Sequence, residues 1–221
     1  MGDDFSQHQF YAGADDPDEM RRRLLLHLRR VLHHAGYDEV AAEASADRSL
    51  VVGPAAHWVQ IGDSAGSTES ADPQAFAALA AALSTLGPVI DISMSDAAAV
   101  HFYLYRDGRR VDQFGNAAFP FYAFTDPDEA ALYRGRPDLW ADLLLRPDEV
   151  ERLRGAWVQG WGASEILATT GELFGWDPQL SWCGYTFDAD GVPEKWNHFL
   201  QGSGVDLGAF TELHFRRGDA G

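Results

Sequence analysis

The stretch that decides the fold is residues 89–114, VIDISMSDAAAVHFYLYRDGRRVDQF. It holds three runs with strand composition, which are residues 89–94, 99–105 and 109–114. Asp107-Gly108 separates the second run from the third, and this dipeptide is a strong signal for a two-residue hairpin turn. The stretch therefore predicts consecutive strands joined in an antiparallel arrangement.

The side chains of these strands divide into two faces, because successive residues of a strand point in opposite directions. One face of the second run is apolar, with Val100, Phe102 and Leu104. The opposite face is polar and aromatic, with His101, Tyr103 and Tyr105, and the first run adds Asp91 and Ser93 to it. We expect helices to pack on the apolar face.

Helical and strand patterns extend on both sides of this stretch. Asp16-Pro17 and Asp72-Pro73 each combine a capping residue with a proline at the first helical position, so helices should follow them. Strand composition recurs at 49–52, 58–61, 180–187 and 210–215, and helical patterns at 137–145, 147–157 and 164–174. The sequence predicts an α+β protein, a single domain with a central, mainly antiparallel sheet and helices packed on one face.

The first fifteen residues have no apolar period and several acids, so we expect a flexible acidic arm over 1–15. No internal repeat or low-complexity linker divides the remainder, which predicts one α+β domain over 16–221.

The formal net charge of the 221-residue chain is −17, which disfavours nucleic acid as a partner because phosphate binding needs lysine and arginine. Residues 38–107 carry ten acids against Arg48 and Arg106, so a protein partner, if there is one, should be basic. Solubility alone also accounts for such a charge. No apolar run is long enough for a membrane helix, and the acidic start does not fit a signal peptide. With one cysteine, Cys183, the chain fits a reducing compartment, and we expect it to be cytoplasmic.

The sequence has no motif that holds a cofactor, phosphate or metal, so we expect none. Residues 186–197 match a calcium loop in part, but the glutamate of its last position is replaced by Asn197, and a hairpin turn is the better interpretation. Cys183 lies in a predicted strand, where a buried inert thiol is expected.

Two groups of residues are candidates for binding. The first is the polar sheet face, with Asp91, Ser93, His101, Tyr103 and Tyr105. The second is Trp157 and Trp161, which a continuous helix would place on one face. Solvation of the polar face and core packing of the tryptophans remain the alternatives.

Several segments resemble those of uncharacterised bacterial α+β proteins of the toxin-immunity type. They are SLVVG at 49–53, HWVQI at 57–61, DAAAVHFYLYRDGRRVD at 96–112, LFGW at 173–176 and GYTF at 184–187. The resemblance implies a non-enzymatic protein that neutralises a protein partner.

Two further functions stay open. One is an enzyme with a dispersed active site, for which His101, Asp91 and Tyr103 are the candidates. The other is a small-ligand sensor that uses the aromatic loop 115–133. A deep pocket with a perturbed histidine or aspartate would favour an enzyme, and a flat acidic surface would favour protein binding. Nothing in the sequence indicates the oligomeric state.

Overall fold

A computed structural model of the chain describes most of its residues. The described residues are 5–13, 16–41, 45–66, 72–95, 99–116, 127–158, 162–177, 186–187, 193–194 and 206–218.

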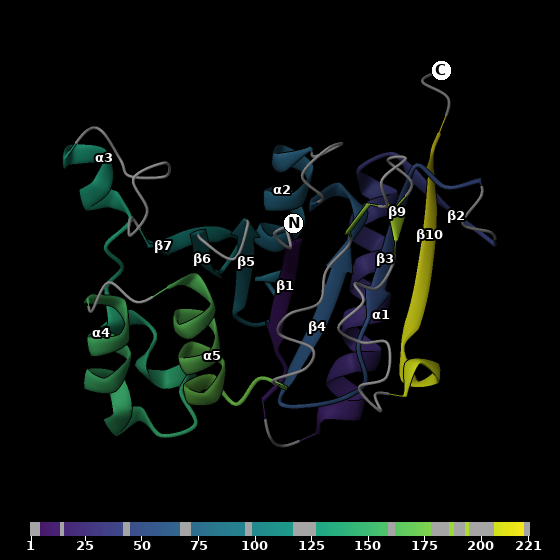
Figure 1. Ribbon diagram of the computed structural model, residues 1–221. Coiled ribbons are helices and arrows are strands. Elements are labelled where there is room, and N and C mark those ends of the chain that lie inside the picture. Colours follow the sequence, from purple (N-terminus) through teal and green to yellow (C-terminus); the bar gives the residue numbers. More distant parts are fainter. Residues whose placement is uncertain are drawn as a thin grey trace.

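Eight strands form one sheet in which all neighbouring strands are antiparallel, in the order β2-β10-β3-β4-β1-β5-β6-β7 (Figure 1). The strands are β1 (Phe5–Tyr11), β2 (Tyr37–Val40), β3 (Arg48–Val52), β4 (Trp58–Asp63), β5 (Val89–Ser95), β6 (Ala99–Arg106), β7 (Arg109–Gly115) and β10 (Thr211–Arg217). The predicted α+β class and antiparallel sheet are confirmed. A separate antiparallel pair, β8 (Thr186–Phe187) with β9 (Pro193–Glu194), agrees with a hairpin in this segment.

The hairpin between β6 and β7 has the predicted turn. Asp107 and Gly108 both have positive φ, at 50° and 79°, which is the backbone of the turn type that Asp-Gly favours. In the resulting register, Phe102 stands opposite Ile92 on one side and Phe114 on the other. The local turn thus sets the alignment that brings the apolar residues of three strands together.

The helices are α1 (Pro17–His34), α2 (Pro73–Leu83), α3 (Pro127–Leu132), α4 (Val150–Val158) and α5 (Ala163–Phe174). Asp16 and Asp72 cap α1 and α2, and each carboxylate accepts a bond from the backbone N–H three residues later. The segment 137–145, which was expected to be a helix, instead contains two 3₁₀ turns, η3 (Pro137–Leu139) and η4 (Ala141–Leu143). The extended backbone of Leu144, with ψ of 148°, ends the second turn.

Helices cover both faces of the sheet. On the predicted apolar face, Phe102 and Phe114 are buried in one core with Trp157 of α4 and Phe174 of α5. On the opposite face, α1 and α2 enclose a second core that joins buried residues of several strands to the helices; its members include Leu24, Leu28, Leu83, Leu50, Ile61 and Val89. The helices predicted on the apolar face are present. Helices were expected on one face only, and α1 and α2 cover the other face as well.

The expectation of a flexible arm over 1–15 is wrong for residues 5–11. They form β1, which lies inside the sheet between β4 and β5 (Figure 1). Phe5 to Phe10 are all buried. The polar residues of this strand find partners on its neighbours: the Gln60 amide donates to Gln7 Oε1 at 2.6 Å, and His8 Nδ1 lies 2.5 Å from Asp91 Oδ1. Because the polar side chains of β1 are buried with partners, the strand lacks the apolar alternation by which a buried strand is usually recognised in a sequence.

None of the described helices combines the length and the apolar character that a membrane crossing requires.

Candidate functional site

Four charged side chains form a continuous chain across four adjacent strands on the α2 face of the sheet. They are Arg48 of β3, Asp63 of β4, His8 of β1 and Asp91 of β5, and we call them the ionic chain. Arg48 Nε donates to Asp63 Oδ1 at 3.0 Å, and its Nη2 also bonds the second carboxylate oxygen. His8 Nε2 lies 3.6 Å from Asp63 Oδ2, an ion-pair distance, and His8 Nδ1 bonds Asp91. All four side chains are buried.

Each charge in the ionic chain changes the proton affinity of its neighbours. Burial alone would lower the pKa of His8, but Asp91 and Asp63 outweigh it and raise that pKa to about 9. Burial also opposes ionisation of Asp63, yet the adjacent Arg48 guanidinium holds the pKa of this carboxyl well below its ordinary value. Burial raises the pKa of Asp91 above its ordinary value, although His8 acts against it. At neutral pH the chain therefore holds two cations, Arg48 and His8, with the Asp63 carboxylate between them and Asp91 bonded to His8.

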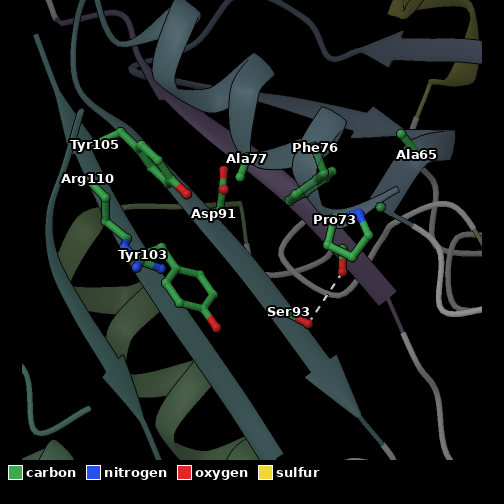
Figure 2. A pocket seen from close by; sticks show the side chains of 11 residues that line it. Ala65, Pro73, Phe76, Ala77, Asp91, Ser93, Tyr103, Tyr105 and Arg110 are labelled. Atoms are coloured by element: carbon green, nitrogen blue, oxygen red, sulfur yellow. Dashed lines mark hydrogen bonds between the residues drawn. The ribbon is translucent and has the colours of Figure 1, made fainter. Parts of the chain in front are cut away.

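A pocket of about 330 Å³ lies at the Asp91 end of the ionic chain. Figure 2 shows Phe76 on one side of the pocket and Tyr103 on the other, with Asp91 and Ser93 of β5 between them. Asp91 is only 2% exposed, and it lines this pocket. The pocket thus combines aromatic walls with one buried charged group.

The first turn of α2 holds the Phe76 wall in place. The Phe76 ring stacks on the His8 imidazole with centroids 3.9 Å apart and planes at 21°. Arg48 Nη2 donates to the Ala75 carbonyl at 3.2 Å. A Cβ on Gly66 would lie 2.4 Å from the Phe76 ring, so glycine is required at that position. The ionic chain and this wall of the pocket are therefore one packed unit.

Two tyrosines of β6 form the opposite wall. Burial raises the pKa of both Tyr103 and Tyr105 above the ordinary value, and the nearby Asp91 carboxyl adds to this effect at Tyr105. Both therefore stay neutral hydroxyls. The Arg110 guanidinium of β7 lies over the Tyr103 ring, with its carbon 5.3 Å from the centroid. Arg110 is exposed, and it lines the same pocket.

The structure brings four of the seven residues expected at a binding site into this pocket, namely Asp91, Ser93, Tyr103 and Tyr105. His101 lies farther along β6, where it packs against Tyr103 and against Tyr133, with ring centroids 6.2 and 5.6 Å away. Burial lowers its pKa, so it is a neutral imidazole.

The tryptophan pair does not belong to this site. Trp157 is buried in the core on the other face of the sheet, where it stacks on Phe114 at 4.4 Å. Trp161 lies outside the described residues, as do Cys183 and residues 117–126 of the aromatic loop. Within the described ranges, no group of three or more His, Cys, Asp or Glu residues is placed to hold a metal ion.

Sequence reasoning missed His8, Asp63, Arg48 and Phe76. His8 falls in the segment that was assigned to the arm, and Phe76 fits the apolar stripe of α2. The charges of Arg48 and Asp63 stand at the beginning and end of strands, where solvated side chains are common. The one signal for this region is Asp91, which stands inside a strand on the face it shares with Tyr103.

No protein-family model matches this chain, and no curated protein or solved structure matches it significantly. The resemblance to toxin-immunity proteins therefore stays a prediction, and the function is argued from the site alone.

Proposed function

We propose that the protein binds a small organic ligand in the pocket between α2 and strands β5 and β6, with Asp91 as the buried hydrogen-bond acceptor for it. The observation that carries this proposal is the position of Asp91: a nearly fully buried carboxylate faces a pocket of about 330 Å³. Pockets for small molecules are typically concave and mostly apolar, with a few placed polar groups.

The cost of the ionic chain supports a role beyond stability. Removing paired charges from water costs several kcal/mol for each ion, and apolar residues of similar volume often stabilise a fold as well or better. The rest of this face is built that way, with Leu28, Ile61 and Val89 in its core. Groups with perturbed pKa values that border a cavity are typical of functional sites.

Docking of a basic protein, the function expected from the charge, has less support. Its two tyrosine anchors, Tyr103 and Tyr105, line the pocket and pack beside a buried carboxylate. Several acids of the 38–107 stretch are engaged within the fold: Glu39 pairs with Arg29, Asp72 caps α2, and Asp47 accepts from the Arg217 backbone N–H. Binding of a basic protein stays a prediction, and it would have to use a surface other than this pocket.

Proton-transfer catalysis is a second candidate, and one observation favours it. The pKa of Asp91 is raised, and its side chain lines the pocket. Asp91 is also bonded to His8, whose imidazole is doubly protonated at neutral pH. A carboxylate in such a setting acts as a general acid or base when a substrate places a suitable atom against it. Ligand binding is the part that both candidates share.

The test is a fragment screen by protein-observed NMR with amide resonances as the readout. Uncharged and charged single-ring fragments should shift the amides of Phe76, Ser93 and Tyr103 in the wild-type protein, and Asp91→Asn should remove these shifts. The matched control is Asp112→Asn, because Asp112 is also a buried aspartate but bonds Trp140 and Arg136 instead. Fragments that shift none of the pocket amides, or that bind equally well to Asp91→Asn, would contradict the proposal.

A further inference from the structure

We infer that the pocket selects a small single-ring anion, which places its acid group at Arg110 and a neutral O–H or N–H donor at Asp91. This inference rests on the proposed function and assigns the chemical class of its ligand. It depends on three features: the charge at the mouth, the state of the carboxylate at the floor, and the shape of the walls.

The charge at the mouth is positive because Arg110 has no carboxylate partner among the described residues. Several other arginines near the surface do have one: Arg22 pairs with Glu19, Arg106 with Asp142 and Arg152 with Glu172. Arg110 is instead held over the Tyr103 ring at the edge of the pocket, and no ion pair joins it to any described residue. An unpaired guanidinium with free donors fits a carboxylate or phosphate group.

Asp91, at the floor of the pocket, already has a cationic partner and does not require a cation from the ligand. Asp91 already bonds the protonated His8, and Asp63 is bonded to Arg48, so the charges of the ionic chain compensate one another. A ligand ammonium would add a third cation to this chain and would meet Arg110 at the mouth. A neutral donor can instead use the remaining lone pairs of the Asp91 carboxylate without changing the charge balance.

The walls fit one flat ring. Phe76 and Tyr103 face each other across the pocket (Figure 2), and both are rigid aromatic groups. Aromatic pairs prefer offset-stacked or edge-to-face contacts, which an aromatic ring between these walls can make with both. A cavity of about 330 Å³ is at the small end of the range for ligand pockets, and it admits a ring with a short acidic side chain.

The experiment uses four probes that share a benzene ring and differ in one group at a time. They are 4-hydroxyphenylacetate, with an acid and a hydroxyl; 4-ethylphenol, with the hydroxyl alone; phenylacetate, with the acid alone; and tyramine, with the hydroxyl and an ammonium. Dissociation constants come from NMR titration of the full chain. We expect 4-hydroxyphenylacetate to bind best and tyramine worst, with a difference on the order of tenfold or more, which an exposed charge pair of about 1.4 kcal/mol produces.

Two variants test which side chain of the protein contacts each end of the ligand. Arg110→Ala should weaken 4-hydroxyphenylacetate and phenylacetate by roughly five- to tenfold and leave 4-ethylphenol unchanged. Arg109→Ala is the matched control, since Arg109 is also an exposed arginine of the hairpin but does not line the pocket. Asp91→Asn should weaken the three hydroxyl-bearing probes more than phenylacetate.

The possible failures are distinguishable. Tighter binding of tyramine than of the acids, or an equal effect of Arg110→Ala on all four probes, would overturn the anion assignment while the pocket stands as a ligand site. Failure of all four probes, together with pocket shifts caused by other fragments, would overturn the ligand class alone. Failure of the probes and of every fragment would overturn both this inference and the proposed function.

Discussion

The two faces of the sheet are built in different ways. Against α4 and α5, the sheet presents apolar side chains such as Ile92, Phe102 and Phe114, and the enclosed core is rich in aromatic rings. Against α2, the same strands present Asp91 and its bonded His8, with a pocket beside them. The first face gains stability from close packing, whereas the second accepts the cost of buried charge. On the proposed function, the α4/α5 face mainly supports the fold and the α2 face binds the ligand.

The largest effect is expected on the apolar face. Phe102→Ala should lower the free energy of unfolding by about 3–5 kcal/mol, because it removes a fully buried ring and leaves a cavity among three strands. Urea denaturation measures this change. Leu132→Ala serves as the control, since Leu132 is 66% exposed and should cost less than about 0.5 kcal/mol. Equal costs for the two substitutions would show that Phe102 is not a core residue.

The second expected effect is a dependence of stability on pH that comes from the α2 face. The pKa of His8 is raised from 6.5 to about 9 in the folded protein, so folding is favoured by its protonation. That contribution, about 3 kcal/mol, is fully present below pH 6.5 and is lost as the pH rises through about 9. Urea denaturation at several pH values between 6 and 10 should therefore show a decline in stability across this range.

His8→Gln should remove most of this decline, and it provides the control for other groups that titrate in the same range. If His8→Gln does not fold, Asp91→Asn gives the same information, because loss of the Asp91 charge lowers the pKa of His8 and moves the decline to lower pH. A wild-type profile that stays flat from pH 6 to pH 10 would contradict the charged state of the ionic chain.

The smallest expected effect is that of Asp91→Asn on stability itself. Burial raises the pKa of Asp91, so keeping this carboxyl ionised costs folding free energy that the neutral side chain of asparagine, similar in shape, does not. The lost ion pair with His8 and the relieved burial of a charge oppose each other, so the free energy of unfolding at pH 7 should fall by less than the roughly 3–5 kcal/mol that breaking a buried ion pair usually costs. Thermal and urea denaturation of both proteins check this. A loss of 3 kcal/mol or more would mean that Asp91 serves the fold rather than a ligand.

What could be predicted from the sequence follows the same division. The turn at Asp107-Gly108 and the alternation around Phe102 are local patterns, and they correctly indicate the hairpin and the apolar face. Shared strand parity also identified Asp91, Tyr103 and Tyr105 as neighbours on the opposite face.

The remainder of the site depends on contacts between residues that are far apart in the sequence. His8 and Asp91 are 83 positions apart, so no local pattern shows that His8 has a partner inside a sheet. A strand such as β1, with Ser6, Gln7, His8 and Gln9 in succession, has the composition of a solvated segment. Its burial becomes understandable only when the neighbouring strands supply the bonds.

The measurement that tests the account most directly is the protonation of His8 in the free protein. The ¹⁵N chemical shifts of the imidazole nitrogens, assigned by comparison with His8→Gln, report whether the ring carries one or two protons. The ionic chain predicts a doubly protonated ring at pH 7.5 that becomes neutral only as the pH rises through about 9. A neutral His8 ring at pH 7.5 would contradict the ion pairs of His8 with Asp63 and Asp91. It would also remove the main argument for proposing the α2 face as the ligand-binding one.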